Sequence, residues 1–177
     1  MTEHHPTIIV GAGLSGLYIA WQLHLRQQDV VVLEARERCG GRITSPNLGT
    51  QPDSCIDLGP AWLWPQLQPR LNQLVTELEI KLFKQFTTGD MQYEIDPRNI
   101  GRYRAQSSHS QSWRIVGGCQ RLIDNLAARL PESTIHLNTR VTSIDQSELR
   151  IQAVRGGQVC EFAADKIILA LPLRRIG

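Results

Sequence analysis

The sequence predicts an α/β protein of the Rossmann type, in which a parallel central sheet is joined to a small antiparallel β-meander. The first observation is a β-branched run at residues 7–10 that ends in glycine and leads into a helical pattern at 15–27. A second apolar run follows at 30–33, and such a β-α-β unit implies parallel strands with a right-handed crossover. The third observation is a set of three short strand patterns between residues 140 and 162, which is typical of a meander.

Glycine, proline and polar clusters divide the rest of the chain into further elements. In chain order we expect a loop at 36–60, a helix at 66–78, strands at 80–86 and 91–95, a polar and flexible segment at 97–112, a strand at 112–118, a helix at 118–130, strands at 134–137, 140–144, 148–154 and 158–162, and a final strand at 166–172. Gly156 and Gly157 lie between two meander strands. This pair favours a tight turn whose two central residues have positive φ.

Length and composition limit the class of protein. Of the 177 residues 41% are hydrophobic, which is enough for a core and argues against disorder. The net charge of +2 and the absence of a lysine or arginine run exclude a nucleic-acid-binding tract. No stretch reaches the roughly 18 apolar residues of a membrane span, so we expect no membrane partner. The four cysteines are widely spaced, which predicts reduced thiols, a cytoplasmic location and no metal site.

The first glycine cluster has the pattern of a dinucleotide-binding turn. Gly11 allows the sharp turn out of the strand, Gly13 lets a pyrophosphate approach the backbone, and Gly16 lets the helix pack on the sheet. Leu14 and Ser15 complete the turn at the helix N-terminus, where unpaired N–H groups favour anions. The pattern alone is a weak signal, but here a strand precedes it, a helix follows it and an acid ends the next strand.

That acid is Glu34, placed where a carboxylate accepts hydrogen bonds from ribose hydroxyls. It disfavours NADP, because it would repel a 2′-phosphate, but NAD and FAD share this half of the pattern. A second glycine pair then leads into Arg42, and Arg36 lies before the pair. Both arginines can reach phosphate oxygens. A nicotinamide dehydrogenase does not need this extra loop, whereas a longer cofactor such as FAD does.

With these residues in view, the sequence resembles the flavin-containing amine oxidase family, which includes monoamine, polyamine and L-amino-acid oxidases. The most specific block reads IIVGAGLSGLYIAWQL…VVVLEARERCGGRI, and further blocks read DLGPAWLWP, WRIVGGCQRLIDNLAARL, IHLNTRVTSI and IILALPL. The resemblance implies FAD as cofactor and a FAD-binding fold of the glutathione-reductase type. It also implies oxidation of a C–N bond of a small amine, with O2 as the electron acceptor.

The resemblance also implies individual roles. Gly11, Gly13, Leu14, Ser15 and Gly16 would hold the pyrophosphate, and Glu34, with Ala35 and Arg36 beside it, would bind the adenosine ribose. Further roles fall to residues that composition and spacing do not single out. They are Gly41 and Arg42 at the phosphates and flavin, Gly59, Pro60, Ala61 and Trp62 along the isoalloxazine ring, and Val141 at the adenine. No residue can be assigned to catalysis, because the relatives' flavin-facing lysine lies in a later part of their chains.

The chain departs from the family in length. Relatives carry a large helical substrate region where this chain has only residues 66–112, and they continue well past residue 177. We therefore expect residues 1–65 and 113–177 to form the FAD-binding domain, residues 66–112 to be a short remnant of the substrate-domain insertion, and the rest of the substrate domain to be truncated or missing. An uncovered sheet edge near the C-terminus predicts self-association or a covering partner.

Two other interpretations stay open. A related flavoprotein acting on carotenoids or porphyrinogens would share the glycine pattern but should have a more apolar substrate region than residues 66–112. The chain could instead be a non-catalytic domain that binds FAD or only ADP-like ligands.

Overall fold

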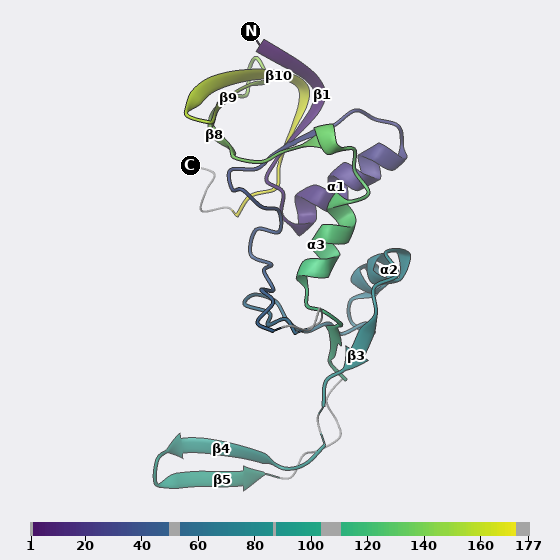
Figure 1. Ribbon diagram of the computed structural model, residues 1–177, viewed down its shortest axis with the longest axis vertical. Helices are drawn as coiled ribbons and strands as arrows, with labels where there is room; N and C mark the ends of the chain where they lie inside the picture. Colours follow the sequence, from purple (N-terminus) through teal and green to yellow (C-terminus); the bar gives the residue numbers. More distant parts are fainter. Residues whose placement is uncertain (1, 50–53, 87, 104–110, 173–177) are drawn as a thin grey trace. The chain divides into compact units, whose positions relative to one another are not determined.

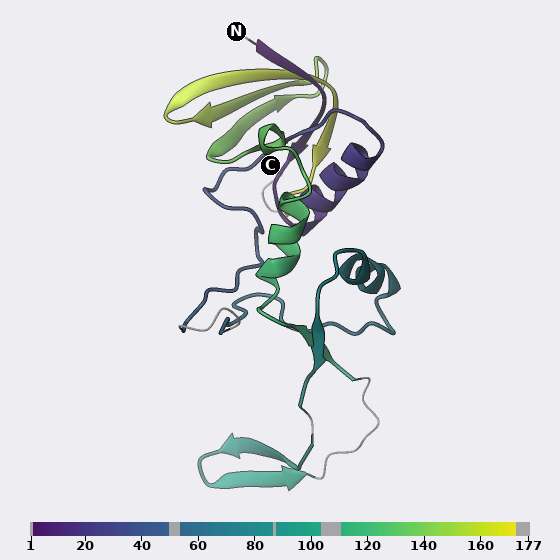
Figure 2. The same cartoon turned by 45° about the vertical axis from the view of Figure 1, so that its right-hand side comes forward.

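The computed structural model describes residues 2–49, 54–86, 88–103 and 111–172. The chain divides into two units, Met1–Pro60 with Gly117–Gly177, and Ala61–Val116. Each unit is described by itself below. Figures 1 and 2 show the elements of both.

The first unit is built on a six-stranded sheet in the order β7-β2-β1-β10-β9-β8. Its strands are β1 (Thr2–Val10), β2 (Val31–Leu33), β7 (Ile135–His136), β8 (Thr139–Asp145), β9 (Arg150–Arg155) and β10 (Gln158–Leu169). The first three strands and β10 run parallel, whereas β9 and β8 continue from β10 as an antiparallel meander. The predicted fold class is therefore confirmed. The turn between β9 and β10 has positive φ at Gly156 (58°) and Gly157 (81°), as expected.

Two strand predictions were wrong at this sheet. The separate strands expected at 158–162 and 166–172 are one continuous strand, because β10 pairs with β9 through its first half and with β1 from Glu161 to Leu169. The strand expected at 7–10 begins at Thr2, since the polar residues before it also pair with β10. Pro6 is tolerated there because β2 reaches only the last three residues of β1, which leaves that edge without a ladder.

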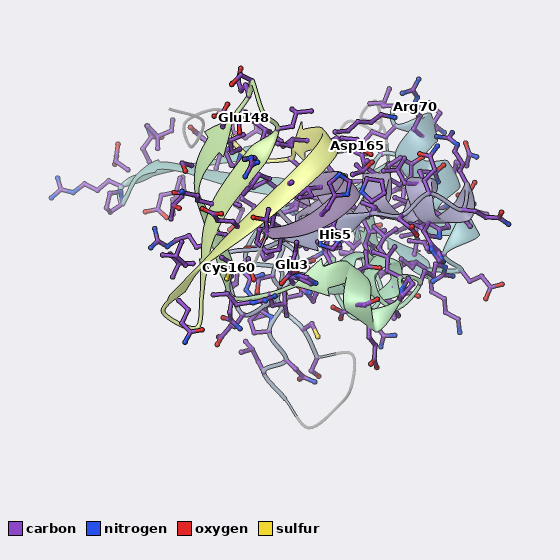
Figure 3. All side chains as sticks on the ribbon, turned by 90° about the horizontal axis from the view of Figure 1, so that it is seen from above. Glu3, His5, Arg70, Glu148, Cys160 and Asp165 are labelled. Carbon is purple, nitrogen blue, oxygen red and sulfur yellow. The ribbon has the colours of Figure 1, made fainter. Side chains whose placement is uncertain are left out.

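Charged side chains accompany this extension of β1 along β10. His4 Nε2 lies 3.1 Å from a carboxylate oxygen of Asp165, and Glu3 accepts a 3.4 Å contact from the guanidinium of Arg155. Figure 3 labels Glu3, His5 and Asp165 on the two neighbouring strands. These pairs are exposed, so we assign most of the stability of the extension to its backbone ladder.

The sheet is strongly curled (Figure 1). A cluster of apolar side chains from β1, β2, β9 and β10 packs together on its concave face. The buried members of this cluster are Ile8, Val10, Val31, Leu33, Ile151, Ala153, Phe162 and Ala164. The curl brings the two outer strands together, because β7 at one edge is followed after two residues by β8 at the other. The N–H of Thr139 at the start of β8 donates to the carbonyl of Glu34, 2.8 Å away.

Two helices of the first unit pack against each other: α1 (Leu14–Leu25) and α3 (Gln120–Ala127). They bury Leu17, Ala20, Ile123 and Leu126, all fully or almost fully inaccessible. Ile9 alternates with the core residues Ile8 and Val10 and is also fully buried, so β1 is covered on both faces, as parallel strands usually are. A short 3₁₀ helix, η1 (Glu132–Thr134), leads from the end of α3 to β7.

The described residues of the second unit form one helix and four short strands. They are α2 (Pro69–Glu77), β3 (Leu82–Lys84), β4 (Met91–Asp96), β5 (Asn99–Tyr103) and β6 (Trp113–Ile115). β3 pairs antiparallel with β6, and β4 forms a hairpin with β5. The segment expected at 97–112 contains the strand β5, which was not predicted, whereas 104–110 lie outside the described residues. Asp96 accepts a hydrogen bond from the N–H of Arg98 (2.9 Å), which stabilises the hairpin turn.

No helix among the described residues is long and apolar enough to cross a bilayer.

Candidate cofactor site

The glycine turn between β1 and α1 is closely packed on one side and open on the other. Gly11 has a φ of 105°, and its N–H donates to the carbonyl of Leu33 (2.8 Å). A Cβ on Gly16 would lie 2.0 Å from the carbonyl oxygen of Gly11, so only glycine fits there. By contrast, nothing lies within 4 Å of the position that a Cβ on Gly13 would occupy. Gly13 thus faces open space at the mouth of the turn.

This open side carries the N-terminus of α1. Gly13 is the N-cap residue, has no side chain to cap the helix, and accepts the N–H of Leu17 through its carbonyl (3.0 Å). The N–H groups of Leu14, Ser15 and Gly16 are therefore the donors that a helix start leaves without an intrahelical partner. Together with the helix dipole they favour a phosphate group at this position.

Glu34 connects this turn to the end of β2. One carboxylate oxygen accepts the N–H of Ala12 at 2.8 Å, and the other accepts the N–H of Arg36 at 3.0 Å. The side chain is only 8% exposed. A carboxylate offers about four acceptor positions, so two backbone donors leave room for a pair of hydroxyl groups. This arrangement fits a ribose diol, as the sequence analysis predicts.

The second glycine pair lies directly beside the first cluster. The N–H of Gly40 donates to the carbonyl of Ala12 (2.8 Å), and Gly40 forms a parallel bridge with Gly13. A Cβ on Gly41 would lie 3.6 Å from the Cα of Gly13. The structure therefore brings Gly11, Gly13, Gly16, Glu34 and Gly41 together around one opening, which we call the glycine mouth.

Arginine guanidinium groups hold this second loop in place. Arg36 donates to the carbonyl of Gly41 (2.8 Å), while Arg38 donates to the carbonyls of Cys39 (3.0 Å), Gly41 (3.1 Å) and Ile43 (3.1 Å). Arg36 was predicted as a ribose or phosphate contact, whereas sequence reasoning missed Arg38. Its partners are main-chain carbonyls, and residue types in the sequence do not reveal such partners.

The remaining predicted residues fall into two groups. Gly59 belongs to the first unit and lies against Arg42, because a Cβ there would be 2.2 Å from the Arg42 carbonyl oxygen. Pro60 ends this part of the first unit, whereas Ala61 and Trp62 belong to the second unit, where Trp62 is 54% exposed.

Val141 lies on β8, the strand whose first residue bonds to the carbonyl of Glu34. Its side chain packs against the concave-face core. A hollow of about 320 Å³ opens nearby, lined by Arg36, Glu37, Arg38 and Asn138. The N–H of Asn138 donates to the carbonyl of Arg36 (2.9 Å), which fixes one wall of this hollow. Ala35, also predicted, is exposed beside it.

Cys39 lies in the same loop but is a poor nucleophile. Burial raises the pKa of its thiol above the ordinary value of 9.0, and the negative charges of Glu34 and Asp124 raise it further. The thiol therefore stays protonated at neutral pH.

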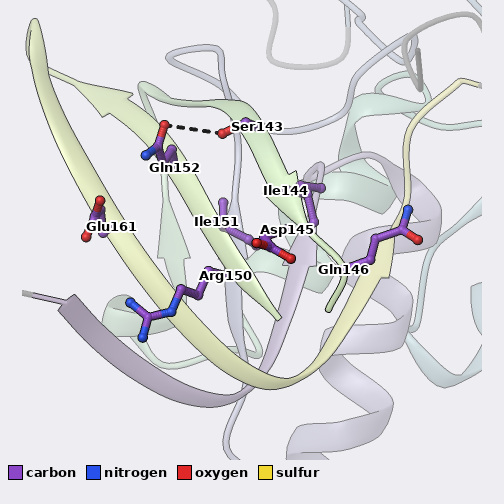
Figure 4. A pocket seen from close by; sticks show the side chains of 8 residues that line it. All are labelled: Ser143, Ile144, Asp145, Gln146, Arg150, Ile151, Gln152 and Glu161. Atoms are coloured by element: carbon purple, nitrogen blue, oxygen red, sulfur yellow. Dashed lines mark hydrogen bonds between the residues drawn. The ribbon is translucent and has the colours of Figure 1, made fainter. Parts of the chain in front are cut away.

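A larger hollow of about 490 Å³ lies on the meander, where Figure 4 shows its lining side chains. Two of the charged side chains that line this hollow already have partners within the chain. Asp145 accepts hydrogen bonds from the hydroxyl and N–H of Ser147, and Arg150 pairs with Glu148 at 2.8 Å. None of its lining residues belongs to the glycine mouth, so we do not assign the cofactor to it.

Family comparisons agree with this geometry. Residues 9–78 match the model of an NAD(P)-binding Rossmann-like domain, and residues 100–177 match the model of the flavin containing amine oxidoreductases. Most of the chain is therefore similar to the flavin-containing amine oxidases. A probable flavin-containing monoamine oxidase A of Dictyostelium discoideum is 29% identical over 148 residues, which are 82% of this chain and 32% of that protein. Putrescine oxidase of Kocuria rosea is 36% identical over 86 residues, 49% of this chain and 17% of that protein.

A solved structure of wild-type putrescine oxidase with putrescine bound superposes with a TM-score of 0.80 at 19% identity. The superposition covers 97% of this chain and 59% of that chain, which shows a shared fold. The chain spans about a third of the length of the Dictyostelium relative.

The matching family model and relatives are described as flavin-containing, so FAD is the cofactor to compare with this site. The residues present fit it, since the open face at Gly13 accommodates a pyrophosphate and the carboxylate of Glu34 has acceptor positions left for a ribose.

Proposed function

We propose that this chain binds FAD at the glycine mouth and uses it to oxidise a C–N bond of a small amine, with O2 as the electron acceptor. The observation that carries the proposal is the Glu34 carboxylate. It is buried and held by the Ala12 and Arg36 amides beside the open face of Gly13.

The chemistry that a bound FAD would supply is removal of a hydride equivalent from the carbon next to the amine nitrogen, with the two electrons passing to O2 to give hydrogen peroxide. The protein's contribution is binding and orientation. The α1 N-terminus binds the pyrophosphate, Glu34 binds the ribose, and Arg42 neutralises phosphate charge. We further propose that Val141 contacts the adenine through its backbone, and that residues 59–62 lie along the isoalloxazine ring.

The amine substrate is supported by relatives named for amine oxidation, among them a putrescine oxidase. We propose residues 66–112 as the short counterpart of their substrate region. The four cysteines, which form no disulfide, support a reducing compartment such as the cytoplasm.

One observation favours a second candidate, a domain that binds FAD or ADP without turnover. The adenosine and pyrophosphate half has the most closely defined geometry, because Glu34 accepts the N–H of Ala12 within the glycine turn. Such a domain would retain the nucleotide half of the cofactor alone.

Absorption spectroscopy and a peroxide assay test both candidates. The purified chain is titrated with FAD, and the flavin band between about 350 and 500 nm is followed for the fine structure of a bound flavin. The loaded protein is then offered a panel of primary amines and polyamines while peroxide is measured. Turnover supports the oxidase. Binding without turnover supports the second candidate, and a protein that binds NADH but not FAD would contradict both.

A further inference from the structure

The helix α3 begins without a cap of its own. Its N-cap residue is Cys119, whose side chain makes no capping hydrogen bond. The first donors of the helix are satisfied from far away in the sequence instead. The N–H of Cys119 donates to Asp57 at 2.7 Å, and the N–H of Gln120 donates to the hydroxyl of Ser45 at 3.0 Å. Ser45 in turn donates to the same oxygen of Asp57 at 2.6 Å.

Asp57 and Ser45 lie opposite each other on a ribbon formed by residues 44–48 and 54–58, which we call the 44–58 ribbon. Backbone bonds join its two sides, from Leu58 to Thr44 (3.0 Å) and from Ile56 to Pro46 (3.2 Å). Gly118 permits the close approach of α3. Its φ is 84°, and a Cβ there would lie 2.6 Å from the Cβ of Ser45. The glycine before α3 is thus explained by contact with this ribbon.

One end of the 44–58 ribbon is flanked by two predicted cofactor residues. Arg42 precedes its first side and Gly59 follows its second, and a Cβ on Gly59 would lie 2.2 Å from the Arg42 carbonyl oxygen. The helix α3 in turn packs on α1, whose N-terminus lies at the glycine mouth. Asp57 and Ser45 therefore link the ribbon to the element that holds the pyrophosphate site.

We propose that Asp57 and Ser45 are positioning residues, which fix Arg42 and Gly59 at the flavin side of the site by tying the 44–58 ribbon to α3. This inference rests on the proposed function. On this inference, different residues hold the two halves of the site in place. The adenosine and pyrophosphate half is held by Gly11, Gly16 and Glu34 without the ribbon, whereas the flavin half depends on it.

Ligand binding by the full chain distinguishes the halves, because ADP uses only the first and FAD uses both. Asp57→Ala removes the acceptor of two charge-assisted hydrogen bonds, from Ser45 and Cys119. It should weaken FAD binding by about tenfold or more and should change ADP binding by less than about twofold. Asp57→Asn keeps an acceptor oxygen and should restore most of the FAD affinity. Asp145→Ala is the matched control, since it also removes an aspartate that accepts local N–H and hydroxyl bonds, but on the meander.

Amide hydrogen exchange of the ligand-free protein gives a readout independent of FAD. Asp57→Ala should speed exchange at Cys119 and Gln120, and Asp57→Asn should not. The inference is overturned if FAD and ADP affinities fall equally, if FAD affinity is unchanged, or if Asp57→Asn loses FAD while the two amides stay protected. Wild-type protein that binds ADP but not FAD also overturns it, whereas wild-type protein that binds neither ligand overturns the proposed function itself.

Discussion

The carboxylate of Glu34 accepts the backbone N–H of Ala12 at 2.8 Å, across 22 residues of sequence. This bond makes the acid part of the glycine turn as well as a candidate ribose ligand. Glu34→Gln would keep the shape but turn an amide NH2 toward one of the two backbone donors, Ala12 or Arg36. We expect a loss of about 1–3 kcal/mol in stability and FAD binding weakened at least about tenfold. Calorimetric titration and thermal melts measure both, with the exposed Glu132→Gln as control. FAD affinity equal to wild type would contradict the ribose assignment.

Two glycines in the same turn should respond differently to alanine. Gly16→Ala places a methyl group against the Gly11 carbonyl and should destabilise the fold by about 1–3 kcal/mol or more. Gly13→Ala has a φ of −76° and open space around the new methyl group, so its melting temperature should stay near wild type. That methyl would occupy the pyrophosphate approach, and FAD binding should fall. Full affinity in Gly13→Ala would place the phosphates elsewhere.

The stability of the curled sheet should depend on pH through His136. Burial lowers the pKa of its imidazole below the ordinary value of 6.5, and the Arg155 guanidinium, 3.4 Å from Nδ1, lowers it further. Glu3 opposes this shift and His5, whose ring centroid lies 6.3 Å away, adds to it. Because the folded protein favours neutral His136, its contribution is unaffected above pH 6.5 and becomes destabilising as the pH falls below that value.

Urea unfolding at a series of pH values measures this effect. Wild-type protein should lose more free energy of unfolding between about pH 7 and pH 5 than His136→Gln does. His24→Gln, on the exposed side of α1, should follow the wild-type curve. Parallel curves for wild type and His136→Gln would show that protonation of this residue is not coupled to folding.

Self-association stays a prediction, and we expect it at one edge of β10. Beyond Ala164, the side of β10 away from β1 has no strand partner among the described residues. Leu169 on this segment is 37% exposed. Light scattering should find dimers, and Leu169→Lys should shift them toward monomer because it places a charge at the open edge. Val159→Lys changes a 70% exposed residue of the same strand where β9 already pairs, and should leave the dimer intact. A wild-type monomer at all concentrations would contradict the prediction.

Much of the fold and part of the site could be predicted from the sequence. The glycine turn and Glu34 follow from a local pattern with a physical cause, and the structure brings them together. Arg38, Asp57 and Ser45 could not be found in this way. Arg38 binds main-chain carbonyls, and Asp57 and Ser45 bind main-chain N–H groups that are 62 and 75 residues distant. β5 was missed because its sequence, NIGRY, has no clear alternation and becomes a strand only by pairing with β4.

The central position of β1 affects how the protein is made. Its partner β2 follows within about two dozen residues, but its register with β10 joins Thr2 to Glu161 and Val10 to Leu169. A nascent chain on the ribosome therefore carries an open strand edge at β1 until residues 161–169 have been translated. We expect newly synthesised molecules to need protection by chaperones during that interval, and slow translation to increase the fraction that aggregates.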